Sequence, residues 1–149
     1  HMAIAGMLDN QSVKCSVAWD GANLGAKGVG FINDPNTIIP WKEYGDTLFM
    51  LNGWSGDKAL QETQKYANEL DLIQRAKQVN GRPVLLVGAD TKVIPMDLHI
   101  KPLEKALQAT DNSQVFYQLI DDDHSFNSSR KELINTTMTF LNGHCKGNK

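Results

Sequence analysis

Three short apolar runs recur along the chain and are separated by segments of mixed polarity. They lie at 13–19 (VKCSVAW), 83–87 (PVLLV) and 115–120 (VFYQLI), and they are rich in β-branched or aromatic residues. Runs that are apolar on both faces are typical of strands buried in a parallel sheet. The first run ends at Asp20-Gly21, a turn signal. We therefore predict three buried strands.

Segments with helical features lie between and after these strands. Residues 3–8 form a short apolar run that we interpret as the last turns of a helix. Further helices are predicted from Ser55 or Asp57 to about Leu70, from Asp71 to Val79, from Asp97 onward with Pro102 in its first turn, and from the capping box Ser129–Glu132 to Gly143. Alternation of strands and helices implies right-handed crossovers. The predicted fold class is α/β, with a mostly parallel sheet that carries helices on both faces.

The region between the first strand and the first long helix has a different character. Residues 23–56 are rich in Gly, Asn and Pro and have no clear period. We predict a long, irregular, lid-like insertion there. We interpret His1-Met2 as a remnant of cloning, residues 3–143 as one partial domain that contains the insertion, and residues 144–149 as a polar tail.

Composition narrows the function classes. The chain has 149 residues, 41% of them apolar and 21% charged, with a net charge of −2. It has no basic stripe that would bind a phosphate backbone, so we expect no nucleic-acid partner. No stretch of about eighteen apolar residues predicts a membrane span, and nothing indicates a compartment. Cys15 and Cys145 lack the spacing of metal ligands, and we interpret them as a buried strand residue and a tail thiol; a disulfide between them is the alternative, which nothing in the sequence supports. We expect no metal and no cofactor.

Three residues that can take part in acid–base chemistry follow the predicted strands. Asp20 follows the first strand directly, Asp90 lies three residues after the second, and His124 lies in a loop after the third. In parallel sheets, reactive groups gather at the carboxyl ends of the strands. A serine hydroxyl becomes a good nucleophile when a neutral imidazole takes its proton and a buried carboxylate orients that imidazole. The sequence therefore predicts part of a catalytic triad.

Residues 82–141 resemble the last third of an α/β-hydrolase of the esterase or peptidase type. The resemblance rests on the strand RPVLLVGAD, the turn at Pro95, the helix around 99–103 and the tetrapeptide DHSF at 123–126, which occur in the usual order of that family. It implies the C-terminal half of an α/β-hydrolase fold. It also implies that His124 is the catalytic base and Asp90 the orienting acid.

The N-terminal segment supplies a second candidate for the acid. Residues 3–25 (AIAGMLDNQSVKCSVAWDGANLG) resemble the stretch that follows the nucleophile elbow G-x-S-x-G in these enzymes. In relatives that resemble platelet-activating factor acetylhydrolases, the acid ends the next strand, where Asp20 stands here. Both acids remain open. The resemblance places the nucleophile just before Ala3, so we expect a chain that lacks it and is inactive alone.

Ser55 is an alternative nucleophile that the sequence disfavours. Gly53-Trp54-Ser55-Gly56 looks like a nucleophile elbow, but Asp57 occupies the position where a small residue is needed. We interpret Ser55 as a helix N-cap or a lid-loop residue.

Two functions are therefore expected from different classes. The first is hydrolysis of a small ester, thioester or amide through an acyl-serine intermediate. The alternative is a non-catalytic assembly module that pairs through the exposed edge of the strand at 13–19, so that the chain self-associates.

Overall fold

The computed structural model describes residues 1–89, 91, 94–111 and 113–146. In chain order the elements are α1 (Met2–Asp9), β1 (Ser16–Trp19), α2 (Leu24–Asn33), the 3-10 helix η1 (Pro35–Thr37), α3 (Ile38–Thr47), α4 (Gly56–Lys65), the 3-10 helix η2 (Ala76–Val79), β2 (Val84–Gly88), α5 (Ile100–Gln108), β3 (Val115–Leu119) and α6 (Arg130–His144). They form two compact units. The first contains residues 1–22 and the described residues from 72 onward, and the second is Asn23–Asp71.

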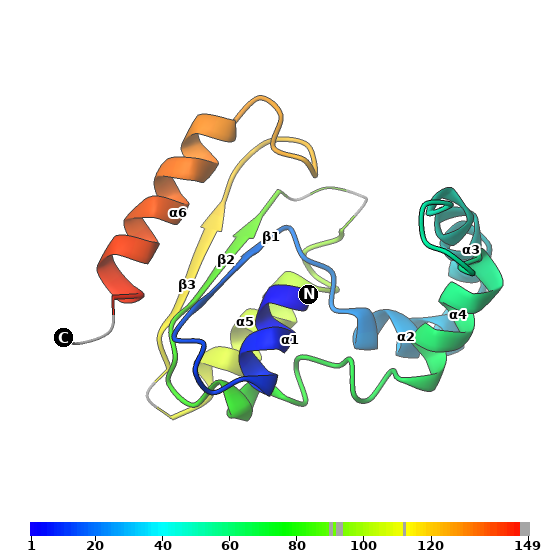
Figure 1. Ribbon diagram of the computed structural model, residues 1–149, viewed down its shortest axis with the longest axis horizontal. Coiled ribbons are helices and arrows are strands. Elements are labelled where there is room, and N and C mark those ends of the chain that lie inside the picture. The colour runs from blue at the N-terminus through cyan, green and yellow to red at the C-terminus, as the bar shows by residue number, and fades with distance from the viewer. Residues whose placement is uncertain (90, 92–93, 112, 147–149) are drawn as a thin grey trace. The chain divides into compact units, whose positions relative to one another are not determined.

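The first unit is built on a sheet of three parallel strands in the order β1-β2-β3 (Figure 1). All residues of the central strand β2 are buried. The prediction of three parallel strands is confirmed, although β1 begins at Ser16 rather than Val13. The first contact of its ladder is the hydrogen bond from Ser16 N–H to the carbonyl of Pro83, which immediately precedes β2. The strand therefore begins where a partner is present to pair with it.

Helices cover both faces of this sheet, as predicted. Helices α1 and α5 pack on one face and α6 on the other (Figure 1). Alternate residues of β2 serve the two faces, because successive side chains of a strand point to opposite sides. Leu86 belongs to the core cluster with α1 and α5, whereas Leu85 and Val87 pack with Leu133 and Phe140 of α6.

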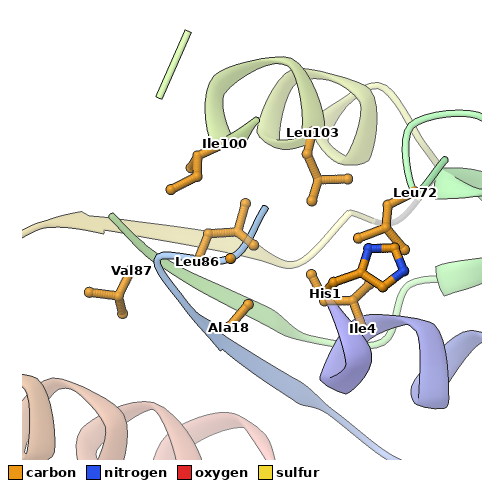
Figure 2. Close-up of a pocket in the computed structure, with 9 residues that line it drawn as sticks. His1, Ile4, Ala18, Leu72, Leu86, Val87, Ile100 and Leu103 are labelled. Carbon is orange, nitrogen blue, oxygen red and sulfur yellow. The ribbon is translucent and has the colours of Figure 1, made fainter. Parts of the chain in front are cut away.

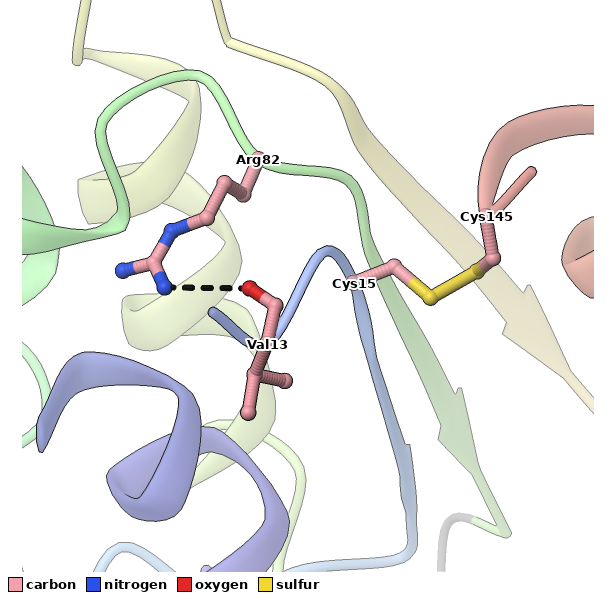
Figure 3. Close-up of a disulfide and its surroundings, with 4 residues drawn as sticks. All are labelled: Val13, Cys15, Arg82 and Cys145. Atoms are coloured by element: carbon pink, nitrogen blue, oxygen red, sulfur yellow. Dashed lines mark hydrogen bonds between the residues drawn. A yellow bond between two sulfur atoms is a disulfide. The ribbon is translucent and has the colours of Figure 1, made fainter. Parts of the chain in front are cut away.

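Arg82 fastens the end of α1 to the start of β2. Its Nη1 donates to the carbonyl oxygens of Met7 and Asn10 at 2.6 and 3.1 Å. It also donates to the carbonyl oxygen of Val13 at 3.2 Å, the bond drawn in Figure 3. Its Nε donates to the carbonyl of Val79 at 2.8 Å. One guanidinium therefore satisfies the carbonyl of Met7, which the helix terminus otherwise leaves unpaired, and also bonds the loop that leads into β1.

The second unit corrects the prediction of an irregular insertion at 23–56. This region contains α2, η1 and α3, and the unit continues through α4 to Asp71. Several of its glycines are responsible for the error, because they lie inside helices at close contacts. A Cβ on Gly28 would lie 2.5 Å from the carbonyl oxygen of Thr63, and one on Gly45 would lie 2.8 Å from the Cβ of Ala59. Small residues, rather than large apolar ones, therefore form these contact faces.

The ends of the second unit are joined to each other. Asn23 Nδ2 donates to Asp71 Oδ1 at 2.8 Å, and both side chains are buried. The N–H of Gly25 donates to the carbonyl of Leu70. The segment therefore leaves the first unit and returns to it at neighbouring points.

Several predicted helix boundaries are wrong. The helix expected at 71–79 is reduced to η2 at its end. Helix α5 begins at Ile100 rather than Asp97, with Pro102 in its first turn as predicted. Helix α6 continues through Gly143 to His144, and Ser129 precedes it without a side-chain capping bond. Residue 144, which we assigned to the polar tail, is therefore helical.

The two cysteines form a disulfide, which overturns their interpretation as a buried strand residue and a tail thiol. Cys15 and Cys145 are bonded with their Cα atoms 5.5 Å apart, across 130 positions of the chain (Figure 3). The physical reason is the course of α6, which follows β3 and returns along the sheet. Its C-terminal end therefore meets the beginning of β1, a proximity that sequence spacing does not reveal.

Among the described residues, no helix is both long and apolar enough to cross a bilayer.

Candidate functional site

Asp20 is fixed at the carboxyl end of β1. Its N–H donates to the carbonyl of Val87 at 2.6 Å, and its Oδ1 accepts a hydrogen bond from the N–H of Ala89 at 3.2 Å. Its backbone has a φ of 39°, in the left-handed region that aspartate tolerates better than most residues. The side chain is fully buried. Backbone strain and two backbone contacts therefore aim the carboxylate across the end of β2.

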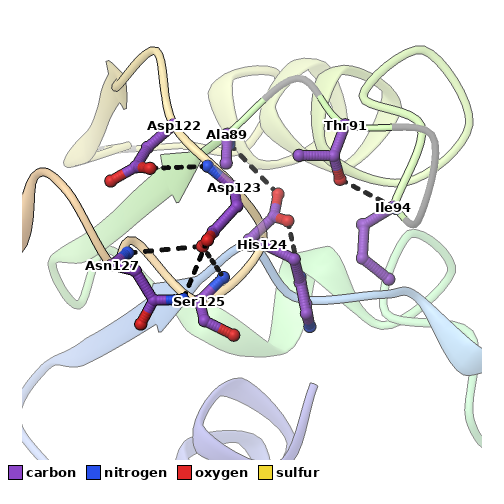
Figure 4. A network of polar contacts seen from close by, with 9 residues as sticks. Ala89, Thr91, Ile94, Asp122, Asp123, His124, Ser125 and Asn127 are labelled. Atoms are coloured by element: carbon purple, nitrogen blue, oxygen red, sulfur yellow. Dashed lines mark hydrogen bonds and ion pairs between the residues drawn. The ribbon is translucent and has the colours of Figure 1, made fainter.

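His124 meets this carboxylate from the loop that follows β3. Its Nδ1 lies 2.7 Å from Oδ2 of Asp20 (Figure 4). The exposed fraction of the side chain is 44% for His124 and 0% for Asp20. A carboxylate accepts hydrogen bonds, so Nδ1 carries the proton in this contact. In the part of the chain that the structure describes, no group hydrogen-bonds to Nε2, which leaves that nitrogen for an incoming ligand.

Of the two acids that the sequence offers, Asp20 is the one that the structure places against the imidazole. Asp90 lies outside the described residues, so its assignment remains a prediction. The contact joins residues from opposite edges of the sheet, because β2 separates β1 from β3. Both residues lie at the carboxyl edge, where the chain order of the strands predicted them.

The acidic residues before His124 form hydrogen bonds within the loop. Asp122 accepts from the N–H groups of Asp123 at 2.8 Å and Ser129 at 2.6 Å. Asp123 accepts from the N–H of Ser125 at 2.8 Å and from Asn127 Nδ2 at 2.8 Å. The sequence analysis did not identify these contacts, although an acid two residues before Ser and four before Asn is a recognisable turn pattern.

These hydrogen bonds change the acidity of both carboxyl groups. Desolvation opposes ionisation of Asp122, but the N–H donors of Asp123 and Ser129 outweigh it and lower its pKa below the ordinary value. The side-chain hydrogen bond from Asn127, with further N–H donors of the loop, lowers the pKa of Asp123 against the opposing effect of desolvation. Both groups are therefore held in the charged, accepting form.

Ser55 and the histidines at 99 and 144 lie elsewhere. Ser55 caps α4, with its Oγ accepting from the N–H of Lys58 at 3.2 Å, as predicted. His99 is buried just before α5. His144 packs against Phe116, with ring centroids 4.1 Å apart.

Two hollows in the first unit do not include His124. One is an enclosed apolar space of about 10 Å³ between the sheet, α1 and α5, lined by residues such as Leu86, Ile100 and Leu103 (Figure 2). Its size is that of a single water molecule. The other is an open groove of about 430 Å³ lined by residues of β2, β3 and α6, among them Gln118 and Asn135. Access to His124 is therefore through its exposed ring rather than through either hollow.

The described residues contain no set of ligands for a metal ion. No three of their His, Cys, Asp or Glu side chains gather in a way that would hold an ion. Asp122 and Asp123 accept hydrogen bonds from backbone N–H groups instead.

Comparison of the chain with protein-family models, curated proteins and solved structures gave no match. The function is therefore inferred from the sequence motifs and from the geometry of this site. That geometry is a solvent-accessible imidazole with one nitrogen fixed on a buried carboxylate and the other open. Such an imidazole can take a proton through Nε2 while the carboxylate stabilises the resulting charge.

Proposed function

We propose that this chain carries the general base and the orienting acid of a serine hydrolase. His124 is the base and Asp20 is the acid. The observation that supports this most is the 2.7 Å contact between the exposed imidazole and a carboxylate with no exposed surface. A buried carboxylate strongly favours a cationic partner, so it stabilises the imidazolium that forms when the base takes a proton.

The reaction follows from the open nitrogen. Nε2 of His124 takes the proton of a serine hydroxyl as its oxygen attacks the carbonyl carbon of the substrate. The bond to the leaving group then breaks, and that group takes the proton from Nε2, which leaves an acyl-serine. Water attacks the acyl carbon and gives its proton to Nε2. The acid is released, and the proton returns to the serine oxygen.

The attacking serine is proposed to come from a part of the whole protein other than residues 1–149. Two observations favour this source: no described hydroxyl hydrogen-bonds to Nε2, and Ser55 is engaged as the cap of α4. The substrate class is a small ester, thioester or amide, because an acyl-serine forms from each of these.

The test uses the full-length protein and short p-nitrophenyl esters. We expect His124→Ala to lower kcat by about 10³-fold or more, because the base is lost. The matched control is His144→Ala. It removes a histidine at the end of α6 that packs on Phe116 and Phe140 and takes no part in the contact between His124 and Asp20. A fluorophosphonate probe should label the wild-type serine and the control but not His124→Ala. Hydrolysis that survives His124→Ala at the wild-type rate would overturn the proposal.

A second candidate function is assembly through the edge of β1. Among the described strands, β1 pairs only with β2 and ends the sheet. The N–H groups of Ser16 and Asp20 point to β2, so those of the alternate residues Val17 and Trp19 point to the open edge. Open strand edges favour pairing with another chain, and the proposed occupant is β1 of a second copy.

Light scattering distinguishes this candidate. We expect a dimer for the wild-type chain and a monomer for Val17→Pro, because proline removes an edge N–H without changing the ladder to β2. The control is Leu119→Pro, which makes the same change on β3 at the opposite edge. A wild-type chain that is monomeric at high concentration contradicts assembly through this edge.

A further inference from the structure

The loop that carries His124 has little contact with the core at the histidine itself. The side chain of His124 is 44% exposed, whereas Phe126, two residues later, is 2% exposed and packs with Leu133 and Phe140 of α6. On the other side, Ile120 is buried and its N–H donates to the carbonyl of Gly88 at the end of β2. The backbone between these two anchors must be held by other interactions if the imidazole is to keep one orientation.

Asp123 supplies most of those interactions. Its Oδ1 accepts from the N–H of Ser125 at 2.8 Å and from the N–H of Asn127 at 3.3 Å, and its Oδ2 accepts from Asn127 Nδ2 at 2.8 Å (Figure 4). Its carbonyl also accepts from the N–H of Phe126 at 3.0 Å. One side chain thus closes the turn that begins on the residue before His124 and ends three residues after it.

The turn needs this closure because its backbone is unusual. Phe126 has a φ of 53°, a conformation that bulky residues rarely adopt. Such a conformation persists only where its surroundings determine it. The two determinants here are the burial of the Phe126 ring and the hydrogen bonds to Asp123 on both sides of it.

Asp122 fastens the same loop to the start of α6. Its two oxygens accept from the N–H groups of Asp123 and Ser129, and the second bond takes the N–H from which the side chain of Glu132 would accept in a capping box. Arg130 adds a bond to the carbonyl of Ser125 at 2.7 Å. These contacts connect the loop with α6, and the bond between Asp122 and Ser129 encloses His124 only within a wider turn, whereas the bond from the N–H of Ser125 to Asp123 joins the two residues directly beside it.

We propose that Asp123 is a positioning residue for His124. It fixes the backbone on both sides of the imidazole, so that Nδ1 lies on Asp20 and Nε2 remains open. The proposal rests on the proposed function for its catalytic consequence, but the positioning itself is a property of this chain. A residue that holds a base within a fraction of an ångström acts on the rate without touching the substrate.

The test measures the Nδ1 proton of His124 by nuclear magnetic resonance on the ¹⁵N-labelled chain. In the wild type this proton should exchange slowly, because it is bonded to a buried carboxylate, and Asp20→Ala should abolish the protection. We expect Asp123→Ala to speed its exchange by about tenfold or more, because the loop then samples open conformations. Asp123→Asn should restore most of the protection, since its amide oxygen can accept the same backbone N–H groups.

The control is Asp121→Ala, which removes the exposed acid next to the loop and should leave the exchange unchanged. A folded Asp123→Ala variant whose Nδ1 proton exchanges at the wild-type rate overturns the proposal. If Asp123→Ala does not fold, the wild type decides: the amide protons of Ser125 and Asn127 must be protected despite their exposure. Exchange of these amides at the rate of an unstructured peptide is equally decisive against it.

Activity gives a separate readout in the full-length protein. We expect Asp123→Ala to lower kcat by about 10- to 100-fold with a smaller change in KM, and Asp123→Asn to recover most of the loss. If the hydrolysis does not depend on His124, the proposed function fails while the exchange measurements still test the positioning. The two failures are therefore distinguishable.

Discussion

Asp20 and His124 come from opposite edges of the sheet and meet across the end of its central strand. Asp20 follows β1, His124 follows β3, and the 2.7 Å contact between Oδ2 and Nδ1 passes over the end of β2. The N–H of Ala89, just beyond β2, donates to the other oxygen of Asp20. All three strands therefore contribute to the position of one carboxylate.

This relationship predicts the effect of Asp20→Asn in the full-length protein. The amide has nearly the shape of the carboxylate, but its NH₂ group facing Nδ1 would make that nitrogen an acceptor and move the ring proton to Nε2. Under the proposed mechanism the imidazole would then be unable to take a proton from the attacking serine, and kcat should fall by about 10³- to 10⁴-fold. Steady-state kinetics on p-nitrophenyl esters measure the loss.

Asp121→Asn is the matched control, because it makes the same chemical change on an exposed acid near the histidine. It should leave kcat close to the wild-type value. If Asp20→Asn retains activity within about tenfold of the wild type, Asp20 does not orient the base, and Asp90 becomes the acid to test.

The disulfide between Cys15 and Cys145 predicts a stability that depends on redox conditions. It closes a loop of 130 positions, and removing a native disulfide typically costs about 2–5 kcal/mol of the free energy of unfolding. Urea unfolding should therefore shift to lower denaturant when a reductant is added. The double variant Cys15→Ser/Cys145→Ser should match the reduced wild type and show no response to reductant. Equal unfolding midpoints for oxidised and reduced wild type would rule out a stabilising bond.

Sequence reasoning located the strands because their chemistry is local. Val84, Leu85, Leu86 and Val87 are buried on both faces of the sheet, so an uninterrupted apolar run was sufficient to identify β2. The start of α6 is harder to predict from the sequence. The N–H of Ser129 donates to Asp122, and the hydroxyl of Ser129 makes no cap. A capping box predicts that the side chain of Glu132 accepts from the N–H of Ser129, and Asp122 of the loop accepts that bond instead.

The sequence alone could not decide which of the two acids, Asp20 or Asp90, lies against His124. Asp20 and Asp90 follow neighbouring strands of a parallel sheet, and chain order alone places both at the same edge. What brings Asp20 to His124 is the left-handed backbone at Asp20 and the N–H of Ala89, and both depend on the register of β1 with β2. Register is a property of the assembled sheet, so the sequence left the alternatives open.

The lowered pKa values of Asp122 and Asp123 predict a loss of stability in acid. A carboxyl group whose pKa is lower in the folded state stabilises the fold above its unfolded pKa, and this contribution disappears as the pH falls through the folded value. Here the ordinary value is 3.8, so the loss should occur at and below that pH. Urea unfolding at about pH 6 and about pH 3 measures it.

Asp123→Asn provides the comparison for this pH effect. The variant cannot ionise at position 123, so its stability should fall less between the two pH values than that of the wild type. Asp121→Asn should behave as the wild type. A slope that is the same for all three proteins would show that Asp123 contributes nothing to the acid sensitivity.

Gly25 and Gly30 offer a matched pair within α2. A Cβ on Gly25 would collide with the carbonyl oxygen of Ala67 and the backbone of Asp71, whereas one on Gly30 would meet nothing within 4 Å. We expect Gly25→Ala to destabilise the second unit by about 1–3 kcal/mol through overpacking. Gly30→Ala should stabilise it by about 0.5–1 kcal/mol, because alanine has the higher helix propensity. Thermal unfolding followed by circular dichroism tests both, and the same sign of change for the two variants would contradict the packing.

Ser55 tests the distinction between a nucleophile and a helix cap. Its Oγ accepts from the N–H of Lys58 at the start of α4, so Ser55→Ala should cost about 1 kcal/mol of stability. Ser55→Asp should retain most of it, because a carboxylate accepts the same bond and favours a helix N-terminus. Hydrolysis by the full-length protein should be unaffected by either change. Loss of the acyl-enzyme in both variants, with the fold intact, would instead make Ser55 the nucleophile and place the reaction within this chain.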